Sequence, residues 1–190
     1  ISDNKATGND VAGIYLHSSS NNAIWDNNAD DNPYGIFLTS SSSNIISDND
    51  ATDNGYGIYI IYSSSRNTIS GNTATRNNDY GIYLDSSSGN IIYLNILNNI
   101  INAWSNSANQ WNSPENDTKY NNYTGNYWSD YDGTDFDPID GIGDQPYFIK
   151  GGSERDNYPI MNNTTFKKSG VIQISLDGSL QTSPPTSQAQ

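Results

Sequence analysis

Short aliphatic runs alternate with polar turns along the first half of this chain, and the alternation has a fixed period. Each repeat opens with Gly-Ile, an aromatic residue and an aliphatic residue, and continues through a serine-rich stretch to an Asn-x-Ile step. Gly13, Gly35, Gly57 and Gly81 open the four repeats and lie 22, 22 and 24 residues apart. This period predicts a stacked repeat protein, because one unit of this size cannot bury its own apolar face.

Alternation within each run predicts which side chains point inward. In Ile14-Tyr15-Leu16, the two aliphatic side chains face one side of a strand and the tyrosine faces the other. Two further inward columns recur with the same period. One consists of isoleucines: Ile1, Ile24, Ile46, Ile69 and Ile92. The other consists of small residues and ends in a leucine: Ala6, Ala29, Ala51, Ala74 and Leu97. Three short strands per coil of about 22 residues predict an all-β fold, the parallel β-helix.

Two columns of asparagines follow the same period. The first contains Asn22, Asn44, Asn67 and Asn90, and the second contains Asn4, Asn27, Asn49, Asn72 and Asn95. Asparagine tolerates the unusual backbone angles of a bend, and stacked amides can bond to one another along a ladder. We interpret these residues as structural; a polar binding row is the alternative.

The repeat decays after about residue 102, which divides the chain into three parts. Residues 1–102 are predicted to form regular coils, and residues 103–161 to form degenerate coils and a C-terminal cap. Residues 162–190 contain one alternating stretch, Val171–Leu176, that predicts a strand, followed by a tail rich in Pro, Ser and Thr.

The cap is predicted from its dense aromatic residues, which lie between Tyr120 and Tyr158. An open β-helix end exposes both core and unpaired strand edge, so it must be covered. An independent sugar-binding module is the alternative. Asn109-Gln-Trp111 and Gly125-Asn-Tyr-Trp128 resemble irregular versions of the repeat.

Composition narrows the class of partner. The 190-residue chain has an apolar content of 33%, which suffices for a narrow tube, and a net charge of −13. This charge and the lack of a basic patch exclude nucleic acid and disfavour anionic membranes. No apolar run approaches the length of a membrane span, so no membrane insertion is expected. The absence of cysteine excludes disulfides and thiolate metal sites.

Several features favour an extracellular or cell-surface location. Carboxylates are nearly all aspartates, Glu115 and Glu154 excepted, and Asn, Ser and Tyr are abundant. The chain opens on Ile1 in mid-repeat, which predicts either a longer precursor or a trimmed chain. Acceptor patterns for N-glycosylation begin at Asn116, Asn122, Asn162 and Asn163.

The cap contains a loop rich in aspartates and glycines, which indicates a candidate metal site. Hard oxygen ligands at alternate positions, with glycines that permit a tight turn, suit a structural Ca²⁺ ion. The predicted ligands are Asp135, Asp137, Asp140 and Asp144. Pro138-Ile139 interrupts the alternation and the spacing of an EF-hand is not met, so a solvated acidic loop is the alternative.

The repeats and the cap motifs together resemble a known family. Beside the repeats, the relevant motifs are Gly125-Asn-Tyr-Trp-Ser-Asp-Tyr131, Asp140-Gly-Ile-Gly-Asp-Gln-Pro-Tyr147 and Asp156-Asn-Tyr-Pro-Ile160. Over residues 1–161 the chain is similar to the NosD-like right-handed parallel β-helix proteins, also called CASH domains. This resemblance implies a right-handed β-helix and a location on the cell surface, since such proteins are abundant on archaea and notably on methanogens. The family's usual acidic loop differs from this one at Pro138-Ile139.

The first functional hypothesis is a non-catalytic structural or adhesive surface protein that binds glycans or other surface proteins. An outward column of rings, an aromatic ladder, is its candidate ligand-binding face: Tyr15, Phe37, Tyr59 and Tyr83. The alternative for this column is that the rings stack on one another or lie beneath the C-terminal segment.

The three other candidate functions are a polysaccharide-degrading enzyme, a copper-binding protein and a self-assembling filament. A polysaccharide lyase or glycoside hydrolase needs paired carboxylates or a basic residue, and the candidates are Asp30, Asp31, Asp53, Asp79, Arg66 and Arg76. Turn chemistry explains the same aspartates, so no enzyme is predicted.

Copper prefers His, Met and Cys ligands, and with only His17 and Met161 available no copper site is predicted. The last is a filament or sheath, in which copies stack head to tail and Val171–Leu176 pairs across the junction.

Overall fold

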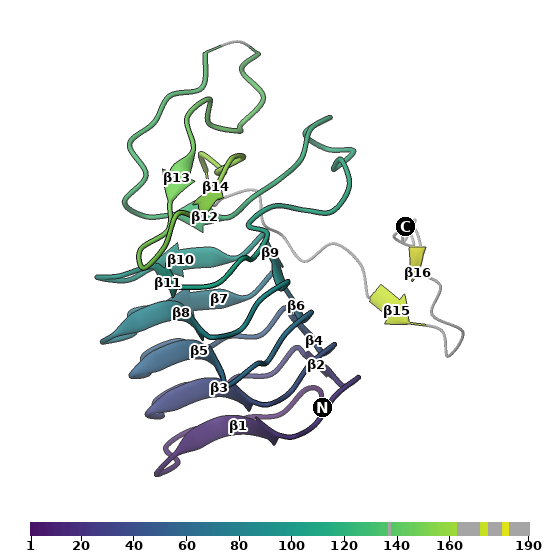
Figure 1. Cartoon of the computed structure of the whole chain (residues 1–190), viewed down its shortest axis with the longest axis vertical. Helices are drawn as coiled ribbons and strands as arrows, with labels where there is room; N and C mark the ends of the chain where they lie inside the picture. Colours follow the sequence, from purple (N-terminus) through teal and green to yellow (C-terminus); the bar gives the residue numbers. More distant parts are fainter. Residues whose placement is uncertain (137, 163–171, 175–179, 183–190) are drawn as a thin grey trace, which may run out of the picture.

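The chain folds into a tube of stacked β coils with a cap at one end (Figure 1). The computed structural model describes residues 1–136 and 138–162 and the backbone of residues 172–174 and 180–182. The described part of the chain consists of strands, turns and bends, as predicted. The strands are β1 (Ala12–His17), β2 (Ala23–Trp25), β3 (Tyr34–Thr39), β4 (Ile45–Ser47), β5 (Tyr56–Ile61), β6 (Thr68–Ser70), β7 (Thr73–Thr75), β8 (Tyr80–Asp85), β9 (Ile91–Tyr93), β10 (Ile96–Asn98), β11 (Ala103–Ser105), β12 (Tyr127–Trp128), β13 (Tyr147–Phe148), β14 (Arg155–Asp156), β15 (Ile172–Ile174) and β16 (Leu180–Thr182).

Three parallel sheets run along the tube. One has the order β1-β3-β5-β8-β11, the second β2-β4-β6-β9 and the third β7-β10-β12. The third sheet is extended towards the first coil by single bridges that join Lys5, Asn28, Asp50 and Thr73 in turn. Each coil therefore contributes one segment to each sheet, which confirms the predicted parallel β-helix.

The predicted inward columns form the core. Ile24, Ile46, Ile69 and Ile92 pair in register, and each is fully buried. The column of small residues is likewise in register through Ala74 and Leu97. Burial of such aliphatic side chains supplies the main favourable free energy of folding, at roughly 25 cal/mol per Å² of apolar surface.

The degenerate segment continues the tube with larger residues. Gln110 pairs with Ile91, which places Trp111 over Ile92, and Trp128 pairs with Leu97. Both indoles are buried, and their centroids lie 5.8 Å apart. The two tryptophans fill the last coil, where the narrow repeat ends.

The glycine before each isoleucine is required by close packing between coils. A Cβ atom at Gly57 would lie 2.6 Å from the carbonyl oxygen of Gly81, and one at Gly35 would lie 2.6 Å from that of Gly57. Any larger residue would push adjacent coils apart. The glycine therefore recurs in each repeat because the backbones of adjacent coils touch there, and not because it has a binding role.

The asparagine columns form hydrogen-bonded ladders. In the second column, Asn49 donates its backbone N–H and its side-chain amide to Oδ1 of Asn72, at 3.0 and 2.9 Å, and Asn72 does the same to Asn95. The first column repeats this pattern from Asn22 to Asn109. Both ladders hold the bends of neighbouring coils in register.

A third ladder, which the sequence analysis missed, occupies another bend. It runs through Asn9, Asn32, Asn54, Asn77, Asn99 and Asn102. Each bend of the coil is thus built around asparagines whose side chains bond the next coil.

All three ladders end on a carboxylate from beyond the regular coils. Asn109 donates to Glu154, Asn126 to Asp156 and Asn102 to Asp130, with shortest distances of 2.6, 2.7 and 2.6 Å. Because every ladder presents N–H donors at this end, an acceptor-only side chain is the matching terminator. The cap is fastened to the last coil through these contacts.

The rest of the cap is irregular. β13 and β14 form an antiparallel pair, and Ile142, Ile149 and Ile160 of the cap are buried. Of the predicted strand Val171–Leu176, residues 172–174 form β15, which pairs antiparallel with β16. The other residues of that strand and most of the tail lie outside the described residues.

Candidate functional site

One face of the tube carries aromatic side chains along its whole length. The four rings predicted as a ladder, Tyr15, Phe37, Tyr59 and Tyr83, lie in register on β1, β3, β5 and β8. Trp104 on β11 continues this column, and Tyr34, Tyr56 and Tyr80 form a second column beside it. We call this five-stranded sheet and its outward rings the aromatic sheet.

The rings of the aromatic sheet pack against one another. Neighbours in the first column stack with centroid distances of 4.7 Å between Tyr15 and Phe37 and 5.1 Å between Tyr59 and Tyr83. Trp104 stacks on Tyr83 at 4.5 Å and 8°. Phe37 and Tyr59 are tilted by 54° instead, with centroids 5.2 Å apart. Where two rings stack, each covers one face of the other.

The two columns form one continuous surface. Tyr34 contacts Phe37 and Tyr59, with centroids 5.0 and 4.7 Å apart, and Tyr80 contacts Tyr83 at 5.1 Å. The sequence held a signal for the second column, because a tyrosine stands directly before three of the four repeat glycines. Trp104 had no such signal, since no Gly-Ile step precedes it.

The aromatic sheet is nearly uncharged. Its strands contain no Lys or Arg, and their ionisable groups other than tyrosine are His17 and Asp85. Burial raises the pKa of Tyr59 to about 12, with smaller contributions from neighbouring tyrosines. Burial is also the main cause that raises the pKa values of Tyr56 and Tyr83. These hydroxyl groups therefore stay protonated at neutral pH.

The predicted calcium ligands have other partners in the structure. Asp135 accepts the backbone N–H groups of Asp140 and Gly141, at 3.3 and 2.8 Å. Asp140 accepts the N–H of Ile142, and Asp144 accepts that of Phe136. Asp137 lies outside the described residues. Within the part of the chain that is described, no group of three or more His, Cys, Asp or Glu side chains is placed to hold a metal ion, and calcium binding stays a prediction.

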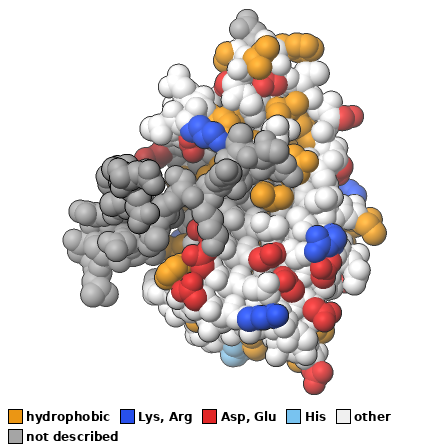
Figure 2. Space-filling view, turned by 180° about the vertical axis from the view of Figure 1, so that it is seen from behind, with side chains coloured by type: hydrophobic (Ala, Val, Ile, Leu, Met, Phe, Trp, Pro, Cys, Tyr) orange, Lys and Arg blue, Asp and Glu red, His pale blue; other side chains and the backbone are white. Residues whose placement is uncertain are grey.

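The candidate residues for sugar hydrolysis lie between the strands, and one of them, Asp79, directly precedes β8 of the aromatic sheet. Figure 2 shows acidic and basic side chains interspersed on the side opposite to that seen in Figure 1. Arg76 donates two hydrogen bonds of 2.8 Å to Asp53, and Asp30 accepts the backbone N–H of Thr52 at 3.0 Å. Arg76 is therefore engaged by a carboxylate, and this arrangement gives no specific support to a lyase base.

The Arg76–Asp53 pair yields a testable expectation about stability. Both side chains are exposed, and exposed ion pairs contribute little and are screened by salt. The Arg76 hydrogen bonds lower the pKa of Asp53, so the pair stabilises the fold above the unfolded pKa of about 3.8 and loses that effect as the pH falls. We expect Arg76→Ala to lower the urea concentration at the midpoint of unfolding slightly at low salt, and to leave it unchanged at high salt. Arg66→Ala, at an exposed bend, is the control; a large shift that persists in salt would contradict the expectation.

The predicted glycosylation sites differ in accessibility. Asn116 and Asn162 are exposed, whereas Asn122 is half-buried. The Asn122 side chain accepts the backbone N–H of Tyr123 at 2.8 Å and donates to Asp140 at 3.5 Å. Asn163 lies outside the described residues. Glycosylation of these sites stays a prediction.

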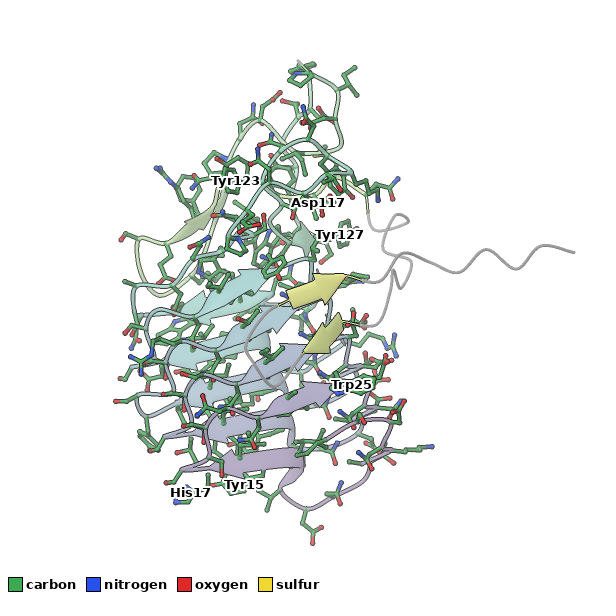
Figure 3. All side chains as sticks on the ribbon, turned by 90° about the vertical axis from the view of Figure 1, so that its right-hand side faces the viewer. Tyr15, His17, Trp25, Asp117, Tyr123 and Tyr127 are labelled. Carbon is green, nitrogen blue, oxygen red and sulfur yellow. The ribbon has the colours of Figure 1, made fainter. Side chains whose placement is uncertain are left out.

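The soft metal ligands of the chain lie far apart. His17 ends β1 in the first coil, as labelled beside Tyr15 in Figure 3, whereas Met161 follows the cap strands and donates its backbone N–H to Gly141. Figure 1 shows the coils that lie between β1 and the cap strands β13 and β14. The two side chains cannot join in one coordination sphere.

Comparison with known proteins identifies a family for this chain. The family described as "Periplasmic copper-binding protein (NosD)" matches residues 1–133. No curated protein and no solved structure matches the chain. The described residues include no helix with the length and hydropathy needed to cross a membrane. The copper in the family's description does not fit the donors of this chain, since His17 lies in the first coil, Met161 lies in the cap and cysteine is absent.

Proposed function

Because the chain belongs to the NosD family, we propose that it is a non-catalytic β-helix of the periplasm or cell surface and that its aromatic sheet binds glycans. The observation that carries this proposal is the continuous surface of rings on all five strands of one sheet. Tyr15 is exposed and the other rings are half-buried. A contiguous apolar surface that remains partly exposed over a whole face often marks an interaction site.

The chemistry of this surface favours sugars over other ligands. Ring edges provide apolar contact, and tyrosine hydroxyl groups both donate and accept hydrogen bonds. The net charge of −13 and the absence of Lys and Arg from these strands oppose binding of polyanions. A neutral glycan meets these conditions.

Self-assembly through head-to-tail stacking is less well supported by the geometry. The donors at the last coil are already bound by Glu154, Asp156 and Asp130. A second copy that approached this end would meet the cap rather than an open coil edge. A filament therefore stays a prediction, to be judged by electron microscopy.

We expect Tyr59→Ala to weaken binding of neutral glycans at least tenfold, since Tyr59 contacts four rings at the centre of the surface. Binding would be screened on an array of neutral and anionic glycans, and affinities would be measured by calorimetry. Phe136→Ala is the matched control, because Phe136 is an exposed ring in the cap.

Circular dichroism of each variant would separate loss of binding from loss of fold. The proposal fails if no neutral glycan binds the native protein, or if Tyr59→Ala and Phe136→Ala bind equally well. Release of reducing sugar or of unsaturated products from the bound glycans would contradict the non-catalytic assignment.

A further inference from the structure

The tyrosine hydroxyl groups of the aromatic sheet form no hydrogen bond with any residue that the structure describes. These hydroxyls belong to Tyr15, Tyr34, Tyr56, Tyr59, Tyr80 and Tyr83. Two tyrosines of the cap do form such bonds. The Tyr131 hydroxyl donates to the carbonyl of Gln145 at 2.7 Å, and that of Tyr147 donates to Asp130 at 3.2 Å.

The unbonded hydroxyls recur with the period of the coils. Successive rings of the second column have centroids 5.4 Å apart between Tyr34 and Tyr56 and 5.6 Å apart between Tyr56 and Tyr80. Parallel strands fix this repeat at about 4.8 Å along the tube. One unit of an extended pyranose chain is of similar length, so a polysaccharide laid along the tube would offer a hydroxyl to each coil.

Ring stacking limits how a sugar can bind here. Sugars commonly lie flat on aromatic faces, but the face of Tyr83 is covered by Tyr59 on one side and Trp104 on the other. Only edges and hydroxyls of the inner rings remain accessible. Recognition must therefore depend on hydrogen bonds to the phenols more than on stacking.

Charge at the border of the sheet selects among polysaccharides. Asp79 lies directly before β8 and Asp85 ends it, and both raise the pKa values of nearby tyrosines through their charge. The same carboxylates would repel uronates or sulfated sugars. No basic side chain on these strands offsets them.

From these observations we propose that the ligand is an extended, uncharged polysaccharide, aligned with the tube axis and recognised by the row of tyrosine hydroxyls. This inference rests on the proposed function and specifies its ligand. The hydroxyls are the specificity-determining groups, and the stacked rings hold them at the spacing of the coils.

Tyrosine-to-phenylalanine variants test the inference, because they remove the hydroxyl and keep the ring. Calorimetry would compare native protein with the double variant Tyr59→Phe/Tyr83→Phe, using cellohexaose and mannohexaose as neutral probes and hexagalacturonate as the anionic one. We expect the double variant to bind about tenfold more weakly to the neutral probe that the native protein binds, because two hydrogen bonds to the sugar are lost. Tyr123→Phe, in the cap, is the control and should bind like the native protein.

The outcomes separate this inference from the proposed function. If Tyr59→Ala abolishes binding while the double phenylalanine variant binds normally, the rings act without their hydroxyls and the inference is overturned while the glycan function stands. Stronger binding of hexagalacturonate than of the neutral probes also overturns it. If the native protein binds none of the glycans, or light scattering shows that the sheet instead joins two copies, the proposed function fails as well.

Discussion

Asn72→Ala is expected to lower the free energy of unfolding by about 3–5 kcal/mol, since each buried group left unpaired costs roughly 1–3 kcal/mol. Asn72 is fully buried. Its side-chain amide donates to Ile46, Ser70 and Asn95, at 2.9, 3.1 and 3.0 Å. Its Oδ1 accepts both donors of Asn49, at 3.0 and 2.9 Å. Alanine removes all of these bonds and leaves their partners without water to replace them.

The matched control is Asn4→Ala, in the first position of the same ladder. The Asn4 amide donates to Ser2 and Asn27, at 2.7 and 2.9 Å, and the side chain is exposed. Water can replace these bonds, so we expect a loss below about 1 kcal/mol. Urea unfolding followed by circular dichroism and tryptophan fluorescence gives both values. Equal midpoints for the two variants would show that the ladder contributes no more inside the tube than at its end.

The regular coils could be predicted from the sequence because each position repeats its environment. An isoleucine at position 24, 46, 69 or 92 has the same neighbours above and below, so the period alone places all four in one column. The family match over residues 1–133 agrees with the resemblance inferred from the motifs. Where the structure is periodic, one repeat contains the information for the others.

The sequence contains two other periodic features that are harder to recognise. The third asparagine ladder has the same spacing as the first two, yet Asn32 and Asn54 stand in segments crowded with Asp and Asn, where turn chemistry explains any single residue. The second aromatic column was hidden because Tyr34 and Tyr56 precede the glycine that marks each repeat. Only the register shows that these rings join the first column.

The contacts of the cap have no period and could not be predicted. Glu154 binds Asn109 across 45 residues of irregular chain, and Asp156 binds Asn126 across 30. The sequence showed Asp and Glu near aromatic residues but not which amide each would meet. The aspartates that were predicted to bind calcium, such as Asp140 and Asp144, accept backbone hydrogen bonds from their own loop instead.

Asp156 is expected to matter more than any carboxylate of the acidic loop. It is fully buried, and its Oδ2 accepts the Asn126 N–H and the Trp128 indole N–H, at 2.7 and 2.9 Å, while its Oδ1 accepts the Tyr158 N–H at 2.9 Å. Asp156→Ala would leave these donors unpaired under the cap. We expect a loss of about 3–5 kcal/mol in unfolding free energy, at roughly 1–3 kcal/mol for each unpaired buried group.

The same residue predicts how stability depends on pH. Burial raises the pKa of Asp156 to about 7, and the hydrogen bonds from its neighbours offset only part of that shift. The folded protein therefore holds this proton more tightly than the unfolded chain, in which the pKa is about 3.8. The contribution to stability is complete below pH 3.8 and is lost as the pH rises through 7. At about 1.4 kcal/mol per pH unit, the loss amounts to about 4 kcal/mol.

Asp156→Asn isolates this effect, because asparagine resembles the protonated carboxyl and does not titrate. Unfolding free energies of the native protein and of the variant, measured from pH 4 to pH 8, should diverge in favour of asparagine as the pH rises. Asp132→Asn, at an exposed position of the cap, is the control. A difference between Asp156→Asn and the native protein that does not change with pH would mean that the carboxylate stays charged throughout this range. The ladder of Asn95 and Asn126 would then end on a permanent anion, held ionised by its donors.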